Sequence, residues 1–352
     1  MIPNNITYKL YTISDLTNWL LHNVDNGLSE IIISKKRAFA LINNPHANVN
    51  DVVLSVVFDS NRVIGYTAVF PEKFIKPVLM ERYYWGTTQW LEPEYRGKGI
   101  SAKMMLNIKV AVNNRYLGLD SSVASTKLDK KQGSVITYYP RYFILIKANT
   151  PNIKGKLKEH YVRIVNKNVI KKLETYQYIN EYVCHIDDMI YDFISKNSKN
   201  DIFLRSQEIL NWQLQYPFLQ CVGFDAHLKH EECQFGTNVH SSSVVAIKVI
   251  KDYRMIGFYI LNVVDGNCIV RYLYYLPEFK NEVFASVLEK SFSTCPTKIS
   301  TVNKVFYEFM IALGIKSMNS NSYSENISLT TPSDFIVDEN MNIQGGDGDL
   351  CF

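Results

Sequence analysis

Runs of apolar residues separated by short polar segments predict several strands in the first half of the chain. Residues 52–58 and 63–70 flank the turn Asp59-Ser60-Asn61, an arrangement typical of a hairpin. Apolar side chains at 100, 104, 108 and 112 have the spacing of an amphipathic helix, and a short helix is predicted at 14–23. The predicted strands of this half are 52–58, 63–70, 82–91, 116–125 and 142–148.

The second half repeats this order of elements. Arg254-Met255-Ile256-Gly257 opens a strand as Arg62-Val63-Ile64-Gly65 does, and both segments follow a strand and a turn. We interpret the recurrence as a weak internal duplication with an offset of about 170–190 residues. Lysine-rich residues 154–172, between the two copies, are interpreted as the approach to a linker. The predicted elements of this half are strands at 243–250, 255–264 and 268–276 and helices at 186–195, 203–215 and 281–291.

Composition and charge narrow the class of protein. The 352 residues suffice for about two domains, and 47% hydrophobic with 20% charged residues is the composition of a globular protein. A net charge of +4 does not by itself indicate nucleic acid as a partner, and six cysteines are too few for a disulfide scaffold. No apolar stretch of about 18 residues predicts a membrane span, and no signal peptide is visible. We therefore expect a cytoplasmic protein that does not bind membranes.

The segment most informative about chemistry is Arg96-Gly97-Lys98-Gly99-Ile100-Ser101, which lies between a predicted strand and a predicted helix. Glycines let the backbone turn tightly and approach a ligand. The first amides of a helix have no partners within the helix and, together with the helix dipole, form a site for a pyrophosphate. The spacing matches neither the P-loop of nucleotide triphosphatases nor the G-x-G-x-x-G dinucleotide fingerprint. The alternative reading is a surface turn with a glycine at a helix end.

This segment resembles motif A of the GNAT superfamily of acyl-CoA-dependent N-acyltransferases, R/Q-x-x-G-x-G/A. Arg96 and Gly99 match the motif, and Ser101 is a small-residue departure at its last position. The resemblance implies an α/β (α+β) fold of two GNAT-like lobes, 1–170 and 171–352, each with a mixed, mostly antiparallel sheet flanked by helices. The second lobe is expected to be degenerate, because Leu276-Pro277-Glu278-Phe279 runs on without the glycines.

The resemblance also implies a co-substrate, acyl-CoA or acetyl-CoA. The backbone amides of residues 97–102, which include Gly97, Lys98, Gly99, Ile100 and Ser101, would hold the pyrophosphate. The strand around Trp90 and Leu91 would hydrogen-bond the pantetheine and polarise the thioester carbonyl. Arg96 and Lys98 either support the phosphates or are solvated loop residues.

Catalytic residues are harder to assign. A tyrosine five residues before a phenylalanine is frequent in the family, and Tyr138 has this spacing to Phe143. Tyr138 would then protonate the departing thiolate. Its neighbour Tyr139 is the alternative acid, and the other interpretation of Tyr138 is a packed aromatic residue without a catalytic role. Glu81, before the strand 83–91, and Asp120, on the next strand, are the candidates for the general base. A water relay or an amine that is already deprotonated would serve equally.

The acceptor is inferred by resemblance alone. Two-lobed chains with one intact CoA lobe resemble sugar-nucleotide N-acyltransferases, whereas Fem-type aminoacyl transferases keep no such loop. We therefore expect a nucleotide-linked amino sugar as the acceptor. The alternatives are a non-catalytic CoA-binding or scaffold protein and a protein or peptide N-acetyltransferase. No metal is expected, because the spacing of His227, His230 and Cys233 matches no standard zinc module, and the C-terminal residues Leu350 and Phe352 either fold back or fray.

Overall fold

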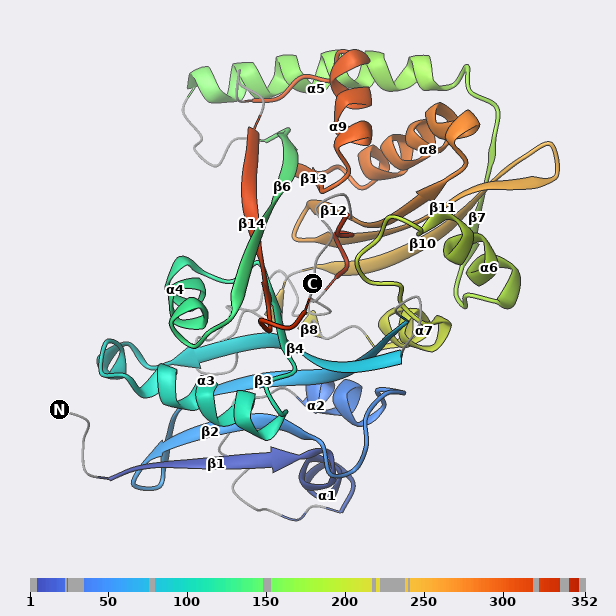
Figure 1. The fold of residues 1–352 in the computed structure, drawn as a ribbon. Coiled ribbons are helices and arrows are strands. Elements are labelled where there is room, and N and C mark those ends of the chain that lie inside the picture. Colours follow the sequence, from blue (N-terminus) through green and yellow to red (C-terminus); the bar gives the residue numbers. More distant parts are fainter. Residues whose placement is uncertain are drawn as a thin grey trace.

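The computed structural model describes residues 5–22, 24, 35–75, 80–147, 153–216, 220–221, 238–239, 241–318, 323–335 and 342–347. One twelve-stranded sheet runs through two lobes in the order β1-β2-β3-β4-β5-β14-β6-β13-β12-β11-β10-β7 (Figure 1). The predicted α/β architecture of two lobes with mostly antiparallel strands and flanking helices is confirmed. The division into 1–170 and 171–352 stays a prediction.

Elements of the first lobe follow the chain from β1 to β6. They are β1 (Ile6–Thr12), α1 (Ile13–His22), α2 (Lys35–Ile42), β2 (Val52–Asp59), β3 (Arg62–Ile75), β4 (Met80–Leu91), a 3₁₀ turn (Pro93–Tyr95), α3 (Ile100–Ala111), β5 (Tyr116–Leu119), α4 (Val123–Lys131) and β6 (Val135–Leu145).

Elements of the second lobe recur in the same order after the connecting helix α5 (Ile153–Leu173). They are β7 (Ile179–Val183), α6 (Asp188–Asn197), α7 (Gln207–Gln215), β10 (Ser242–Lys251), β11 (Arg254–Val264), β12 (Asn267–Tyr275), a 3₁₀ turn (Pro277–Phe279), α8 (Lys280–Ser293), β13 (Lys298–Thr301), α9 (Lys304–Ala312) and β14 (Tyr323–Thr331). A short parallel pair, β8 (Gln220–Cys221) and β9 (Asn238–Val239), is added to this copy. The recurrence confirms the predicted internal duplication.

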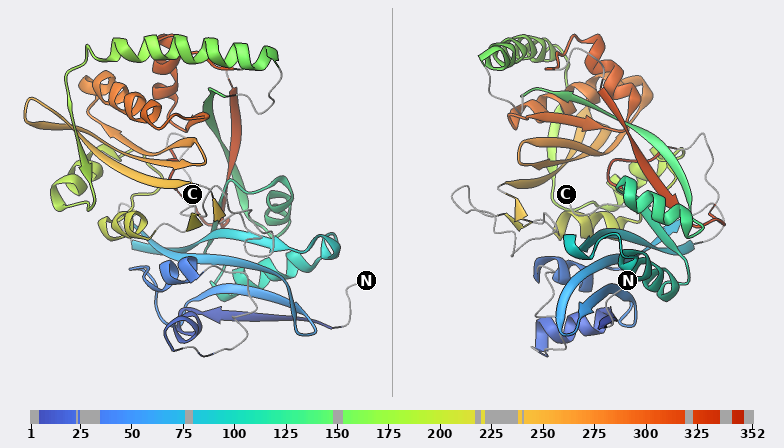
Figure 2. Two further views of the ribbon diagram at one scale, coloured as in Figure 1. Left: turned by 180° about the vertical axis from the view of Figure 1, so that it is seen from behind. Right: turned by 90° about the vertical axis from the view of Figure 1, so that its left-hand side faces the viewer.

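The two lobes exchange their last strands. β6 ends the first copy but pairs with β13 of the second, while β14 ends the second copy and pairs with β5 of the first. β6 and β14 also pair with each other along their length and run side by side between the lobes (Figures 1 and 2). The first lobe is therefore completed by a strand from the far end of the chain.

Helices cover both faces of each half of the sheet. In the first lobe α3 packs Ile100 and Met104 against Ile64 of β3 on one face, and α1 and α2 cover the other face with Leu16 and Leu41. In the second lobe α5, α8 and α9 share one apolar core on one face, and α6 lies on the opposite face. These cores fix the faces of the sheet against the helices.

Two sequence predictions are wrong in this region. Residues 154–172, interpreted as the approach to a linker, are instead a packed helix, the 21-residue α5, whose buried stripe of Val162, Asn166, Val169 and Leu173 is interrupted by exposed lysines. The predicted strand 116–125 ends at Leu119, because Ser122 accepts a hydrogen bond from the Ser125 amide and so caps the start of α4. Within the described residues, no helix is long and apolar enough to cross a membrane.

Candidate functional site

The strands β4 and β5 separate partway along their length. They pair in parallel only at Tyr84–Gly86, opposite Tyr116–Gly118. Beyond Gly86, β4 continues to Leu91, whereas β5 ends at Leu119, which pairs with β14. Among the described strands none pairs with the last part of β4 on this side. A gap therefore opens in the sheet, and a side chain at Gly86 would collide with the ring of Tyr116 at its closed end.

A β-bulge lies where the gap begins. Ala68 of β3 pairs with Thr88 and Val69 pairs with Gly86, so Thr87 is the extra residue. Further along, the Glu92 amide donates to the Ile64 carbonyl at 2.8 Å. Because backbone groups alternate in direction along a strand, those of Trp90 turn toward β3, and those of Gln89 and Leu91 turn toward the gap. Of the predicted pair Trp90 and Leu91, Leu91 is therefore the one that faces the gap through its backbone.

The predicted glycine loop lies at the open end of this gap. Gly97 and Gly99 have φ of 76° and 80°, the left-handed region that favours glycine. A Cβ at either position would meet nothing within 4 Å, and Gly99 precedes α3 with no side-chain cap. The first amides of α3, from Ile100 onward, therefore have no capping side chain, and the loop before them is exposed. The Gln89 side-chain amide donates to the Ser101 carbonyl at 3.4 Å and joins the loop to the gap.

The two cations of the loop differ in their placement. Arg96 turns back, and its Nε donates to the Leu91 carbonyl at 2.9 Å, so it braces the loop against β4. Lys98 stays exposed, with its Nζ 5.3 Å from the centre of the Tyr95 ring. Lys98 is thus the better placed of the two to meet a phosphate.

α4 is held against α3 on the far side of the gap. The Ser125 hydroxyl donates to the Gln89 side chain at 3.4 Å, so Gln89 contacts both helices. Lys109 of α3 and Asp129 of α4 form a buried ion pair at 2.7 Å. Burial raises the pKa of the Asp129 carboxyl, and the Lys109 ammonium opposes that shift. Gln89 and Ser125 were not identified from the sequence. Gln89 could have been noticed, because it is a polar residue two positions before the end of an apolar strand.

Asp120 is the predicted catalytic residue that lies at the gap. It directly follows β5 with a strained φ of 55°, and its amide donates to the Ser328 carbonyl at 2.8 Å. Its carboxylate accepts a hydrogen bond from Arg141 at 2.7 Å, and Arg141 also pairs with Glu325 at 2.6 Å. Asp120 and Arg141 line a cavity of about 230 Å³ between the lobes, with Arg271 on its other wall.

Glu81 and Tyr138 lie away from the gap. Glu81 is six residues before the bulge, roughly 20 Å along the strand at about 3.3 Å per residue, and accepts a hydrogen bond from Tyr83. Tyr138 of β6 pairs with Ser328, so β14 lies between it and β5, at about 10 Å for two strand spacings. Its side chain is 60% exposed, whereas Tyr139 packs against the core of the first lobe. The catalytic roles of Glu81 and Tyr138 stay predictions.

The second lobe has the same strand geometry without the same loop. β12 and β13 pair only from Asn267 to Ile269, and the bulge recurs at Arg271. However, Phe279 leads directly into α8, where Lys280 is already helical with φ of −54°. No left-handed glycines and no exposed amide loop form here, in agreement with the predicted loss of the glycines from this copy.

The chain's own C-terminal segment lies along β12 in the second lobe. The Gly346 amide donates to the Arg271 carbonyl at 2.8 Å, and the Arg271 guanidinium donates to the Gly345 carbonyl at 3.0 Å. Gly345 has no room for a Cβ against the Val270 carbonyl. Residues 342–347 therefore fold back, while Leu350 and Phe352 are outside the described residues.

A buried charge cluster anchors this segment to the first lobe. Arg205 donates to Glu72 of β3 at 2.5 Å and to Asp347 at 3.3 Å, and the Trp85 indole donates to Glu72 at 2.9 Å. Burial raises the pKa of Glu72 to about 7 and that of Asp347 to about 6. Nearby, Asp201 accepts from the Gln344 side chain, and burial raises its pKa to about 8. The cluster is buried, and its groups pair with one another, so its role is structural.

The part of the chain that the structure describes contains no group of three or more metal-ligating side chains. His227, His230 and Cys233 are outside that part.

No protein-family profile and no curated protein sequence matches the chain. Solved structures do match. N-myristoyltransferase of Saccharomyces cerevisiae with bound myristoyl-CoA and inhibitors is similar at a TM-score of 0.53 and 7% identity, over 100% of this chain and 87% of that one. A putative acetyltransferase of Pyrococcus horikoshii has a TM-score of 0.50 and 12% identity, over 98% of this chain and 95% of that one. A tandem GNAT protein from the clavulanic acid biosynthesis pathway has a TM-score of 0.48 and 10% identity, over 94% of this chain and 100% of that one.

Proposed function

We propose that this chain, which has the tandem GNAT fold, is an acyl-CoA-dependent N-acyltransferase. One observation carries the proposal: the gap between β4 and β5 opens beside an exposed glycine loop at the start of α3. The two features meet in the first lobe, and the second lobe lacks the loop. The chain would therefore bind one acyl-CoA.

The order of features along β4 gives the substrate its direction. The amides of residues 97–101 hold the pyrophosphate, because a helix N-terminus with left-handed glycines favours anions. The pantetheine runs along the backbone of Leu91 and Gln89 toward the closed end of the gap. The thioester then lies near the bulge at Thr87, where backbone amides polarise its carbonyl and stabilise the oxyanion.

Asp120 is the proposed base at the end of the gap. The ion pair with Arg141 orients the Asp120 side chain, and a carboxylate next to the thioester holds the attacking amine by a hydrogen bond. The amine nitrogen forms a bond to the thioester carbon, the carbon–sulfur bond breaks, and Asp120 takes the proton that the nitrogen loses. The thiolate of CoA then takes a proton from solvent, and Tyr138→Phe tests the acid role that the spacing predicted for Tyr138.

For the acceptor we propose an amino sugar linked to a nucleoside diphosphate. A second cavity of about 540 Å³ shares Val302 with the cavity at Asp120 and lies between the lobes. Lys196, Lys199 and Lys304 line it and supply cations for a diphosphate. The tyrosines that line it offer flat faces for a base or a sugar: Tyr139, Tyr142, Tyr274 and Tyr275.

The first test is calorimetry with acetyl-CoA and longer acyl-CoA, followed by thiol release against a panel of amino-sugar nucleotides. We expect binding of one acyl-CoA per chain and thiol release with one member of the panel. No acyl-CoA binding would overturn the proposed function. Binding without thiol release for any amine would favour the CoA-binding scaffold, and mass shifts on peptides would favour a peptide acceptor.

Lys199→Gln tests the acceptor site separately. We expect a raised KM for the nucleotide sugar with the affinity for acyl-CoA unchanged, because the substitution removes a cation from the acceptor cavity alone. Lys131→Gln, at the end of α4 and outside that cavity, is the matched control. An equal KM for the two variants and the unaltered protein would argue against this placement of the diphosphate.

A further inference from the structure

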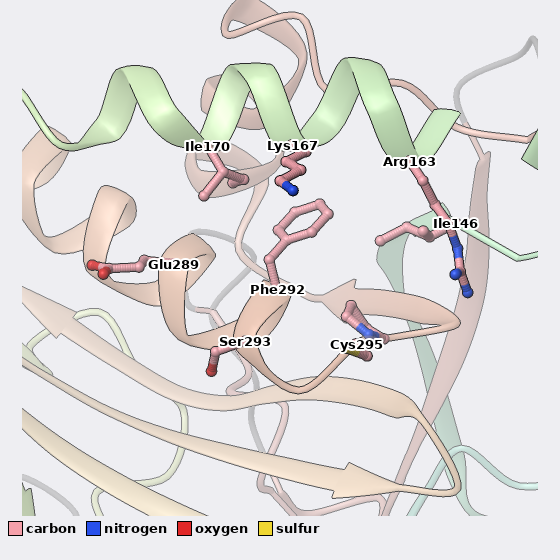
Figure 3. A pocket seen from close by; sticks show the side chains of 9 residues that line it. Ile146, Arg163, Lys167, Ile170, Glu289, Phe292, Ser293 and Cys295 are labelled. Carbon is pink, nitrogen blue, oxygen red and sulfur yellow. The ribbon is translucent and has the colours of Figure 1, made fainter. Parts of the chain in front are cut away.

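A cavity of about 410 Å³ lies in the second lobe between α5 and α8, and we call it the α5–α8 cavity (Figure 3). Ile146, Ile170, Phe292 and Pro296 form its apolar walls. An apolar cavity of about 150 Å³ is enough to hold benzene, and small-molecule sites begin near about 300 Å³. The volume therefore suits a ligand with several carbon atoms.

The cavity follows from how α5 is seated. Val162, Val169 and Leu173 bury one stripe of α5 in the core of the second lobe. Arg163, Lys167 and Ile170 have the i, i+4, i+7 spacing of an adjacent face, so they meet α8 across the cavity (Figure 3). The opposite wall ends at Cys295, whose φ of 52° turns the chain from α8 toward β13.

The two cations of the cavity lie on one wall. Arg163 and Lys167 line it from α5, and Arg163 makes an exposed ion pair with Glu159 at 3.2 Å. The acidic side chain in the wall, Glu289, accepts a hydrogen bond from the Tyr178 hydroxyl at 2.7 Å. An apolar interior with two cations on one wall is complementary to a molecule with an alkyl chain and a single anionic head.

We propose that the α5–α8 cavity binds a medium-chain fatty carboxylate, with the alkyl chain between Phe292 and Ile170 and the carboxylate between Arg163 and Lys167. The cavity lies among elements of the second lobe and the end of β6, and none of the residues that form the β4–β5 gap lines it. The site is therefore independent of the proposed acyl transfer.

Cys295 supplies the probe, because it is exposed and lines the cavity. Its alkylation by iodoacetamide, followed peptide by peptide with mass spectrometry, should slow as octanoate is added. Cys184 is also exposed but does not line the cavity, and its alkylation should be unchanged. Each buried methylene adds about 0.8 kcal/mol, so hexanoate should bind up to about 15-fold more weakly than octanoate.

The charge contribution is tested by a pair of double variants. Arg163→Gln with Lys167→Gln should weaken octanoate by up to about 30-fold, since each exposed ion pair is worth up to about 1 kcal/mol. Octan-1-ol, which lacks the charge, should bind the variant and the unaltered protein equally. Lys171→Gln with Lys172→Gln changes the same charge on the same helix outside the cavity and is the control.

Three results would overturn the proposal: no slowing of Cys295 alkylation at saturating octanoate, equal slowing at Cys184, or equal weakening by both double variants. Gly99→Asp separates this proposal from the transferase. If that variant loses acyl-CoA but keeps octanoate protection of Cys295, the two sites are distinct. If it loses both, the α5–α8 cavity is not the octanoate site.

Discussion

Gly99→Asp is the sharpest test of the proposed pyrophosphate site, and Gly133→Asp is its control. The two glycines have φ of 80° and 85°, and a Cβ at either would meet nothing within 4 Å. Aspartate adopts the left-handed region more readily than most residues, so both variants should fold. Each should lose about 1 kcal/mol of unfolding free energy, because glycine tolerates this conformation best.

The effect on binding should differ between the two variants. Gly99 directly precedes α3 at the open end of the gap, whereas Gly133 lies in the turn between α4 and β6. A carboxylate roughly 5 Å from each of two phosphate charges costs about 0.8 kcal/mol per pair even at the dielectric constant of water. The sum of about 1.7 kcal/mol predicts at least a 15-fold loss of acyl-CoA affinity in Gly99→Asp alone.

Calorimetry with acetyl-CoA at low and high salt measures this effect, and thermal unfolding measures the shared loss of stability. The difference in affinity should shrink as salt is added, because the loop is exposed and the repulsion is screened. Equal affinities for acetyl-CoA in the two variants would refute the pyrophosphate site. A loss in Gly99→Asp that is fully explained by unfolding would refute the electrostatic reasoning.

Three further predictions concern stability and turnover. Burial raises the pKa of Asp201 to about 8, so the stabilising contribution of its protonated carboxyl is present below about pH 4 and is lost as pH rises through 8. The unfolding free energy should therefore decline across that window. Asp201→Asn should flatten this decline, by on the order of 5 kcal/mol at most. A decline of equal steepness in both proteins, measured by urea unfolding from pH 4 to 9, would contradict this. Lys109→Met leaves Asp129 buried without its cation and should lower the free energy of unfolding, measured with urea, by about 3–5 kcal/mol. Adding Asp129→Leu to this variant should restore most of the lost free energy. Since β14 separates Tyr138 from β5, Tyr138→Phe should leave the thiol-release rate within about twofold, and a loss of about 100-fold would establish its predicted acid role instead.

Local sequence signals predicted the elements that build the gap. The hairpin β2–β3, the strand β4, the glycine loop and α3 each lie within a few residues of the predicted ranges. These elements form between neighbours in sequence, and their periodicity is strong because each buries one face or both. The glycine loop was predictable because left-handed backbone before a helix requires glycine at Gly97 and Gly99.

What the sequence did not reveal depends on distant contacts. The exchange of β6 and β14 pairs Tyr138 with Ser328, and no periodicity records which partner a strand will choose. Its consequence for the site was large, because it separates Tyr138 from β5. Helix α5 escaped detection because four buried positions lie among many lysines, so its mean character resembles a solvated linker.

The position of Asp120 shows where sequence and structure meet. Its residue type and its predicted place on the strand 116–125 made it a candidate for the base. Its amide is held by Ser328 of β14 and its carboxylate by Arg141 of β6, two strands that lie after and before α5 in the sequence. Glu81 was an equal candidate from the sequence, but it lies on β4 beyond the paired residues Tyr84–Gly86 and away from the gap. The parallel register of β4 and β5 distinguishes the two residues.

The exchange of strands delays completion of the first lobe during translation. β5 and β6 leave the ribosome early, but their shared partner β14 is translated roughly 200 residues later, after about 10–40 s at about 5–20 residues per second. Throughout that interval the nascent first lobe carries unpaired edges on β5 and β6, which are templates for pairing with a neighbouring chain. The glycine loop is synthesised long before the wall of the gap that β14 supports. In the proposed function, acyl-CoA binding would therefore follow the synthesis of β14 rather than that of the first lobe alone.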